Sequence, residues 1–317
     1  MNATGPTGVA RRRASFALTL SLCLGAAGPA GAAEPALPFT LDQLRIGLPE
    51  EGAPRAVVGP YAVTAERVAA TPALQVYRPR DLAPFPARDT LPIVVWGNGA
   101  CLADGTDFAG YLSTIASYGF FVVTSAPVPG KPEARVTSAD LIKALDWAQA
   151  QASGNSPLAG KLRADAVAVM GMSCGGNLAI EAARDPRVKT LGVWNSGVWN
   201  SGEMRSGDGT LLVATTKADL ARIHSPTIYI NGDIDPALAN AKDDVERLQK
   251  VPVFQASRRN AGHAGTYSHA NGGEFANIAV AWLRWQLKGD AASAKTFQGA
   301  DCALCRDANW TVKRKGF

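Results

Sequence analysis

The sequence has few charged residues and lacks any long block of one sign. Charged side chains make up 19% of the 317 residues, and without acidic or basic runs the usual compositional sign of disorder is missing. Three of the net +5 charges belong to Arg11, Arg12 and Arg13, so the chain without its first 33 residues would carry +2. Such a balanced surface gives no reason to expect a nucleic-acid partner.

Motifs for nucleotide cofactors and metals are also missing. In "WGNGACL" a leucine stands where a dinucleotide fingerprint needs its third glycine. The glycine-rich stretch 171–176 lacks the Gly-Lys-Ser/Thr ending of a phosphate-binding loop. A CxxC at Cys302 and Cys305 has no second pair of ligands of the kind that a structural zinc site requires. We therefore predict neither a cofactor nor a metal.

The apolar run near the N-terminus, Phe16–Gly28, is too short to span a bilayer. It follows the three arginines and precedes a stretch of small residues, an order typical of a secretory signal peptide. We expect this peptide to cover residues 1–33, with cleavage near Ala33. The mature protein is then secreted or periplasmic and has no membrane span. It keeps four cysteines, which suggest disulfides in an oxidising compartment and allow three connectivities.

Short apolar runs alternate with helical patterns through most of the remaining chain. Several runs are continuously apolar, as is typical of strands covered on both faces. The alternation predicts an α/β fold with a mostly parallel central sheet and helices on both faces. The expected strands are 74–79, 91–97, 120–126, 166–172, 190–196, 227–232 and 252–257, and the expected helices are 107–119, 137–152, a stretch after residue 176, 236–250 and 272–289.

A Gly-Met-Ser-Cys-Gly turn, Gly171 to Gly175, joins the expected strand 166–172 to an alanine-rich helical stretch. G-x-S-x-G is the pattern of a sharp strand-to-helix turn, in which small flanking residues let the chain hold a serine above the sheet. A plain glycine-rich junction is the alternative. Because the turn exposes its central residue, we expect Ser173, and not Cys174, to be the nucleophile.

The chain contains only three histidines as candidate bases. In this arrangement the partners follow the serine in the order acid, then histidine, so His224 comes too early. We prefer His263, because it follows the last expected strand in a loop with Gly262 and Gly265. His269, six residues later, remains the alternative and could instead have a capping or supporting role.

The candidate acid lies in "IYINGDIDPAL", an expected strand followed by a loop with two aspartates. We prefer Asp235, which would hold the imidazole in the correct tautomer, and keep Asp233 as the alternative. For the oxyanion we expect one backbone N–H from Cys174. The second should come from the loop after strand 91–97, from Asn98 or else Gly99.

On its motifs at 171–175, 232–235 and 262–263, the chain resembles the α/β-hydrolase superfamily over about residues 74–288. Within it, the chain is most similar to the secreted dienelactone-hydrolase and cutinase-like branch, which includes polyester hydrolases. The supporting features are the short glycine oxyanion loop, the doubled glycine after the serine turn and the little room for a lid. The resemblance implies the α/β-hydrolase fold with a minimal lid.

The resemblance also implies a secreted serine hydrolase that cleaves carboxylic esters through a Ser-His-Asp triad and an acyl-enzyme. Its substrate would be a small-molecule or polymeric ester. Ser173 stands where dienelactone hydrolases carry cysteine, and Asn98 stands where polyesterases usually carry an aromatic. The alternatives are a lipase, peptidase or haloperoxidase on the same fold, or a binding protein of this fold without catalysis.

Three aromatic residues are candidates for binding the substrate, although core packing explains each of them as well. Trp194 and Trp199 flank the segment after an expected strand, and Tyr267 follows His263 closely. An aromatic side chain at this edge of the sheet could line an acyl or aryl pocket.

The cysteines suggest two pairings. The oxyanion loop and the serine turn must approach each other for both donors to reach one oxygen, so we hypothesise a Cys101–Cys174 disulfide, with two buried thiols as the alternative. Cys302 and Cys305 are expected to form a short disulfide that ties down the C-terminal tail. The expected organisation is a signal peptide (1–33), a catalytic domain (34–290) and a tail (291–317).

Overall fold

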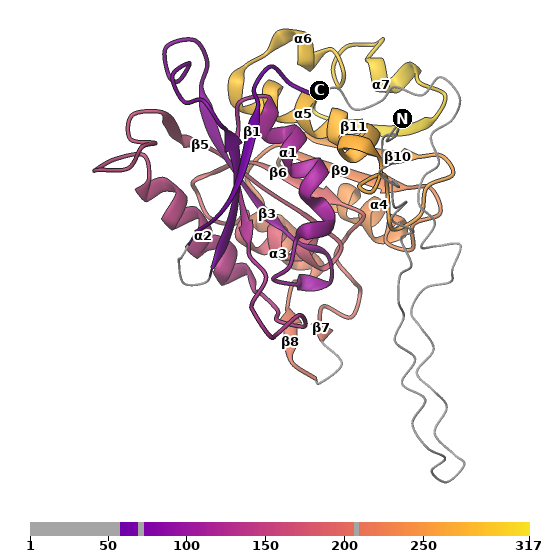
Figure 1. Cartoon of the computed structure of the whole chain (residues 1–317). Helices are drawn as coiled ribbons and strands as arrows, with labels where there is room; N and C mark the ends of the chain where they lie inside the picture. The colour runs from indigo at the N-terminus through magenta and orange to yellow at the C-terminus, as the bar shows by residue number, and fades with distance from the viewer. Residues whose placement is uncertain (1–57, 69–72, 206–208) are drawn as a thin grey trace, which may run out of the picture. The chain divides into compact units, whose positions relative to one another are not determined.

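A nine-stranded sheet runs through the part of the chain that the structure describes, in the order β1-β2-β4-β3-β5-β6-β9-β10-β11 (Figure 1). The computed structural model describes residues 58–68, 73–205 and 209–317. The expected signal peptide and its cleavage site lie outside the described residues. The six inner strands, β4 to β10 in this order, pair in parallel, whereas β1, β2 and β11 add antiparallel pairs at the two edges.

The elements follow one another as strands and helices along the chain. The strands are β1 (Val63–Val68), β2 (Leu74–Pro79), β3 (Leu91–Gly97), β4 (Phe121–Ser125), β5 (Leu162–Met172), β6 (Val188–Trp194), β7 (Met204–Arg205), β8 (Leu211–Val213), β9 (Thr227–Gly232), β10 (Val253–Arg258) and β11 (Trp310–Lys315). The α-helices are α1 (Ala109–Ser117), α2 (Ser138–Ala150), α3 (Cys174–Ala182), α4 (Leu238–Arg247), α5 (Gly273–Lys288), α6 (Ala291–Ala294) and α7 (Ala303–Arg306). Short 3₁₀ turns are η2 (Gly99–Cys101), η3 (Thr106–Phe108), η4 (Lys217–Arg222) and η5 (Ala270–Gly272).

The central strands are continuously apolar because both faces of the sheet are covered. In β3, Ile93 and Val95 belong to one core cluster, whereas Val94 and Trp96 belong to the cluster on the opposite face. All of these side chains are buried. Because successive side chains of a strand point to opposite faces of the sheet, a continuously apolar strand contributes to the cores on both faces.

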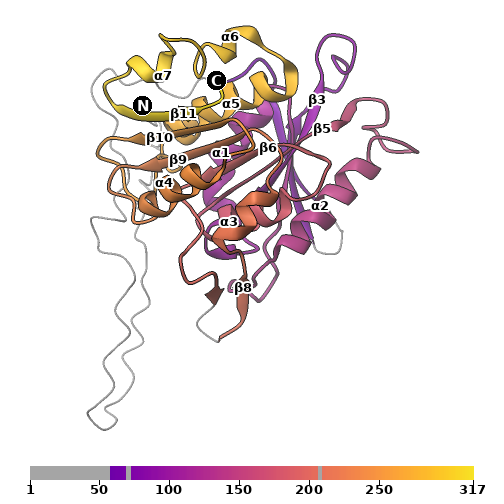
Figure 2. The same ribbon diagram turned by 180° about the vertical axis from the view of Figure 1, so that it is seen from behind.

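Helices cover both faces of the sheet. Helices α2, α3 and α4 contribute to the first cluster and α1 and α5 to the second, and the two opposite views show these groups on opposite sides (Figures 1 and 2). Among the described residues, no helix combines the length and the apolar composition that crossing a membrane requires. The sheet with its two helical layers is the predicted α/β-hydrolase architecture.

The expected strands 74–79, 91–97 and 227–232 are found with the expected bounds. Strands β1 and β11 and the two-stranded ribbon of β7 and β8 were not expected from the sequence. The physical reason is visible in β11, whose sequence WTVKRK has one buried residue, Trp310, followed by exposed and partly exposed ones. An edge strand with one solvated face lacks the continuous apolar run that marks a central strand.

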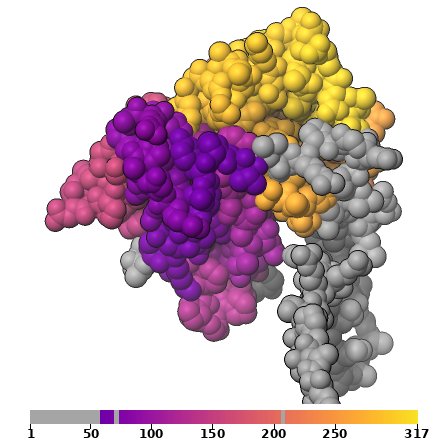
Figure 3. All heavy atoms as spheres, turned by 45° about the horizontal axis from the view of Figure 1, so that its top comes forward, coloured from indigo at the N-terminus to yellow at the C-terminus, as the bar shows by residue number. Residues whose placement is uncertain are grey.

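The C-terminal residues extend the sheet, which a tail held only by a disulfide would not do. Strand β11 runs antiparallel to β10. Val253 lies opposite Lys315 at one end of this pairing, and Arg258 lies opposite Trp310 at the other. Phe297 is fully buried, and its ring packs edge-on against Trp282 of α5 at 5.2 Å. Figure 3 shows these yellow residues packed directly against the orange segments that precede them. Part of the segment 291–317 thus forms an edge strand of the sheet, and the division of the chain into domains stays a prediction.

A buried carboxylate fastens the segment that leaves β6. Asp244 of α4 is fully buried, accepts a hydrogen bond from the backbone N–H of Val198 at 2.8 Å and pairs with Nζ of Lys217 at 2.6 Å. Burial raises the pKa of Asp244 to about 6, although these partners act in the opposite direction. Because the folded-state pKa lies above the ordinary 3.8, the group favours folding below about pH 4, and this contribution is lost as the pH rises towards 6.

The Lys217→Met variant removes the cation and leaves this carboxylate without a charged partner. We expect the free energy of unfolding to fall by about 3 kcal/mol at pH 8, and by clearly less at pH 5, where Asp244 takes up a proton. Urea unfolding at the two pH values measures the difference. The Lys217→Met/Asp244→Asn variant, which keeps an acceptor for Val198, should regain most of the loss, and equal losses at both pH values would contradict the assignment.

Candidate active site

The turn between β5 and α3 holds Ser173 in a strained conformation, with φ 55° and ψ −123°. The flanking glycines are required by close backbone approach. A Cβ on Gly171 would lie 2.2 Å from the carbonyl oxygen of Gly175, and a Cβ on Gly175 would lie 2.1 Å from that of Gly97. The backbones of β3, β5 and α3 therefore meet at a distance that no larger residue allows.

Hydrogen bonds to the backbone of Ser173 offset its strain. The N–H of Ser173 donates to the carbonyl oxygen of Trp194 at 2.9 Å. Its carbonyl oxygen accepts from Oγ of Ser196 at 2.7 Å and from the N–H of Gly176 at 2.9 Å. Nδ2 of Asn177 donates to Oγ of Ser196 at 3.1 Å. The turn is thus tied to the end of β6 from both sides of the serine, as strained backbone at a functional site requires.

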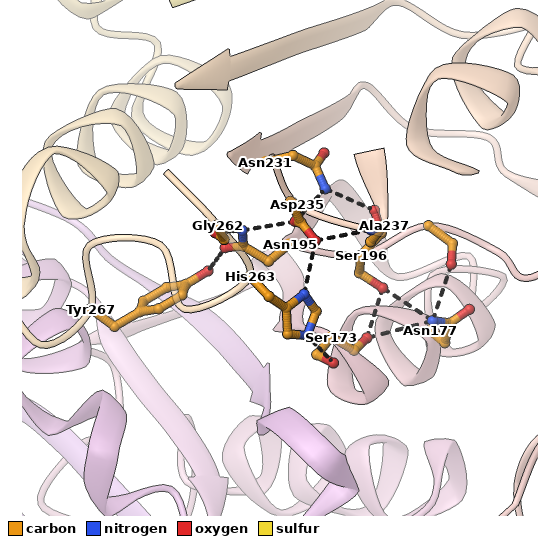
Figure 4. Close-up of polar contacts among 11 residues, drawn as sticks. Ser173, Asn177, Asn195, Ser196, Asn231, Asp235, Ala237, Gly262, His263 and Tyr267 are labelled. Carbon is orange, nitrogen blue, oxygen red and sulfur yellow. Dashed lines mark hydrogen bonds and ion pairs between the residues drawn. The ribbon is translucent and has the colours of Figure 1, made fainter. Parts of the chain in front are cut away.

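Three side chains that are far apart in the sequence form one hydrogen-bonded chain (Figure 4). Oγ of Ser173 lies 2.8 Å from Nε2 of His263, and Nδ1 of His263 lies 2.9 Å from Oδ1 of Asp235. Ser173 follows β5, Asp235 follows β9 and His263 follows β10, so all three lie at the carboxyl ends of parallel strands. Asp235 and His263 are buried, whereas Ser173 is partly exposed. A substrate can therefore reach the hydroxyl.

The carboxylate of Asp235 is held in its charged form. Burial on its own would raise its pKa, but hydrogen bonds from His263, the backbone N–H of Ala237 and Asn231 outweigh burial and lower it. The N–H of Ala237 donates to Oδ1 at 2.9 Å. Asp235 is therefore ionised at neutral pH and can stabilise a positive charge on the imidazole.

The alternative acid and the alternative base that the sequence offered lie outside this hydrogen-bonded chain. Asp233 is exposed, and its backbone N–H donates to the carbonyl oxygen of Arg258 at 2.8 Å. His269 stands at the N-terminal cap of η5, and its carbonyl oxygen accepts from the N–H of Gly272 at 2.9 Å. Neither belongs to the hydrogen-bonded chain through Ser173.

The side chain of Asn98 is turned into the protein. It is fully buried and donates to the carbonyl oxygen of Leu102 at 3.0 Å and to Oγ of Ser125 at 3.1 Å, while its oxygen accepts from Thr124 at 3.1 Å. Within the described ranges, neither the backbone N–H of Asn98 nor that of Cys174 donates to a protein acceptor. Because the side chain of Asn98 is occupied, its backbone N–H is the part of this residue that stays a candidate donor to an oxyanion.

Cys101 and Cys174 form a disulfide with their Cα atoms 5.1 Å apart. Both are buried, and the bond joins η2 to the first residue of α3. Ala100 and Cys101 have φ values of 53° and 54°, unusual for residues with a side chain. A second disulfide joins Cys302 and Cys305.

Two of the three aromatic candidates are core residues. Trp194 is fully buried and packs against Tyr111 at 5.7 Å and Phe275 at 5.9 Å between ring centroids, so it offers no surface to a substrate. Tyr267 is 6% exposed, and its hydroxyl donates to a buried asparagine at 2.9 Å. Both side chains are therefore packed in the core, which is the alternative that the sequence left open for them. Trp199 is partly exposed in the segment after β6, and its contact with substrate stays a prediction.

Sequence reasoning missed two asparagines that contact the acid. Nδ2 of Asn195 and Nδ2 of Asn231 donate to Oδ2 of Asp235 at 2.9 and 3.1 Å. Both stand at or next to the carboxyl end of an otherwise apolar strand, in "VWNS" after β6 and "IYING" in β9. A polar residue at that end of a buried strand is the signal that could have found them.

This arrangement can move a proton from a hydroxyl to an imidazole while the hydroxyl attacks a carbonyl carbon. Asp235 and the imidazole provide the orientation and the charge, and the start of α3 provides backbone N–H groups beside the hydroxyl. Within residues 58–68, 73–205 and 209–317, no three His, Cys, Asp or Glu side chains are grouped so that they could hold a metal ion.

Comparison with curated proteins finds no match. Comparison with family models matches residues 45–306 to the PETase family, described as PET hydrolase-like. The matched range contains the serine turn, both loops that carry Asp235 and His263, and all strands from β1 to β10. The chain therefore belongs to the PETase family, a family of polyester hydrolases within the α/β-hydrolase superfamily.

Proposed function

We propose that this protein hydrolyses carboxylic esters, including those of polyesters, with Ser173 as nucleophile, His263 as general base and Asp235 as the orienting acid. The observation that carries the proposal is the hydrogen-bonded chain from Asp235 through His263 to Ser173, with distances of 2.9 and 2.8 Å. The family match supports an ester as the substrate.

The reaction proceeds in two acyl transfers. Oγ of Ser173 attacks the ester carbonyl carbon while its proton passes to Nε2 of His263, and the imidazolium is stabilised by Asp235. The carbon–oxygen bond to the leaving alkoxide then breaks, and the alcohol departs with the proton from His263. A water molecule repeats the attack on the acyl-enzyme, giving the carboxylic acid and free Ser173.

The backbone N–H groups of Cys174 and Asn98 hold the negative oxygen of the tetrahedral intermediate. Each is free of protein acceptors within the described residues, and each such donor is worth about 3 kcal/mol in the transition state. The Cys101–Cys174 disulfide joins the segment that carries one donor to the residue that carries the other. The covalent bond fixes the distance between the two donors.

Access to Ser173 suits a polymeric substrate. Ser173 is partly exposed, and described parts of the connection between β6 and β9 contact helices. Glu181 of α3 accepts from the N–H of Ala214 at 3.0 Å and from Thr215 at 2.6 Å, and η4 packs on α4. The described parts of this connection are therefore anchored beside the helices, and an extended chain can approach the serine.

The same proposal includes export and the extent of the catalytic domain. Two disulfides favour an oxidising compartment, secreted or periplasmic. The catalytic domain begins after the signal peptide, and it includes the C-terminal residues because β11 belongs to its sheet.

The Ser173→Ala variant tests the nucleophile. We expect the wild type to hydrolyse short p-nitrophenyl esters and a terephthalate ester, and the variant to lose about 10⁶-fold in kcat, because the attacking oxygen is gone. A fluorophosphonate should label the wild-type peptide that contains Ser173. The control is Ser201→Ala, at an exposed serine, which should keep full activity. A label on another residue, or an active Ser173→Ala variant, would contradict the proposal, and preference for a peptide or a long-chain lipid would change the substrate class.

The acid is tested with a matched pair of variants two residues apart. Asp235→Asn removes the charge that orients His263, so kcat should fall by about 10⁴-fold, with a parallel loss in the rate of fluorophosphonate labelling. Asp233→Asn changes an exposed side chain and should leave both rates at the wild-type value. Equal effects of the two substitutions would argue against Asp235 as the acid.

The two disulfides provide a matched pair for the oxyanion hole. Replacing Cys101 and Cys174 by alanine should lower kcat by on the order of tenfold or more, with a smaller change in KM, because the donors act in the transition state. Replacing Cys302 and Cys305 should leave kcat unchanged. Steady-state kinetics and circular dichroism on both variants measure this, and unaltered kcat in the first variant would refute a role for the bond in catalysis.

A further inference from the structure

Asn195 occupies an unusual position directly after β6. It is fully buried and has φ 43°, in the left-handed region that asparagine tolerates better than most residues. Its backbone N–H donates to the carbonyl oxygen of Ile230 at 2.7 Å, which joins the end of β6 to β9. The backbone conformation therefore aims the side chain at the loops that follow β9 and β10.

The amide of Asn195 makes three hydrogen bonds to those loops (Figure 4). Nδ2 donates to Oδ2 of Asp235 at 2.9 Å and to the carbonyl oxygen of Gly262 at 3.2 Å. Oδ1 accepts from the hydroxyl of Tyr267 at 2.9 Å. Gly262 and Tyr267 lie on either side of His263 in the sequence, so one amide joins the acid to both ends of the segment that carries the base.

We propose that Asn195, with its amide held by Tyr267, is a positioning residue that sets the basicity of His263 through Asp235. This inference rests on the proposed function, because it assigns a role within the same Ser-His-Asp site. Asn231 also donates to Oδ2 of Asp235, but it belongs to β9, four residues before the acid. Asn195 is the contact that crosses from β6 to both loops.

Tyr267 reinforces the orientation in which the Nδ2 end of the Asn195 amide faces the acid. If the amide were flipped, its oxygen would stand about 3 Å from a carboxylate oxygen, and the two would repel each other. A hydroxyl that donates to Oδ1 opposes the flip. Burial, followed by the charge of Asp235, raises the pKa of Tyr267 well above its ordinary value, so the hydroxyl keeps its proton throughout the working range of pH.

The other titratable groups around this cluster come from α1, α5 and β10. The ring of Tyr111, on α1, lies 5.3 Å from that of Tyr267, and burial also raises its pKa well above the ordinary value. Glu274, at the start of α5, is paired with Arg258 of β10 at 3.1 Å. Asp235 and His263 are the titratable groups that the amide of Asn195 joins, the acid directly and the histidine through its flanking loop residues.

Removing the hydrogen bond from Asn195 to Oδ2 of Asp235 should change the basicity of His263 in one direction only. The N–H of Asn195 withdraws negative charge from the carboxylate, and without it more charge is available to the imidazolium. The protonated form of His263 is then favoured and its titration midpoint rises. A residue that merely filled space would alter stability and leave this midpoint unchanged.

The experiment follows the titration of His263 by NMR in the full-length mature protein, which needs no substrate. The chain has only three histidines, so the signal can be assigned with single-histidine variants. We expect Tyr267→Phe and Asn195→Gly to raise the midpoint by about 0.5–1 pH unit, and the acid limb of kcat/KM to move with it. The control is Tyr61→Phe, which also removes one tyrosine hydroxyl, here one that donates to the carboxylate of Asp89 at 3.1 Å, and it should leave the midpoint in place.

An unchanged midpoint in folded Tyr267→Phe would overturn the proposal, whatever happens to kcat. Tyr267→Phe decides the matter if Asn195→Gly fails to fold, because only one buried oxygen is removed. If the wild type hydrolyses no ester, the proposed function fails. The NMR midpoints still report separately whether Asn195 and Tyr267 act on His263.

Discussion

Everything at the candidate site depends on the close contact of three backbones, at Gly97, Gly171 and Gly175. This contact brings the end of β3 against the start of α3, so that the backbones of two separate segments lie against each other. It also forces the chain through the strained conformation of Ser173, which lifts the hydroxyl out of the layer of core side chains. The strain at Ser173 and the close approach of the two segments are consequences of one constraint.

A buried carboxylate next to such a turn must be fully hydrogen-bonded, since an unpaired buried charge costs several kcal/mol. Asp235 meets this requirement with four hydrogen bonds, from His263, Ala237, Asn195 and Asn231. Each partner comes from the end of a strand or the loop that follows it. The hydrogen bonds that offset the cost of burying the Asp235 carboxylate are therefore the same bonds that hold the strand ends and their loops in position around it.

The central strands and the three residues from Ser173 to His263 could be proposed from sequence because each has a local signature. Strand 91–97 is a continuous apolar run, and the serine, the acid and the histidine follow such runs in order. The edge strands and the partners of Asp235 have no such signature. From the sequence, Trp194 and Tyr267 could equally line a substrate pocket or pack in the core. Their burial depends on contacts with Tyr111 and Phe275, which come from helices α1 and α5 and are distant in sequence.

In the proposed mechanism the two sides of Ser173 have different tasks, and the structure holds them by different means. The oxyanion side needs only constant geometry, and an uncharged covalent bond between Cys101 and Cys174 supplies it without disturbing the local field. The base side must gain and lose a proton in every cycle, so its supports have to respond to charge. Hydrogen bonds from Asn195 and Asn231 do so, because they strengthen as negative charge gathers on Asp235 and weaken as the imidazolium draws it away. A covalent bond on that side would fix the position of Asp235 but would not respond to changes in the charge of its carboxylate.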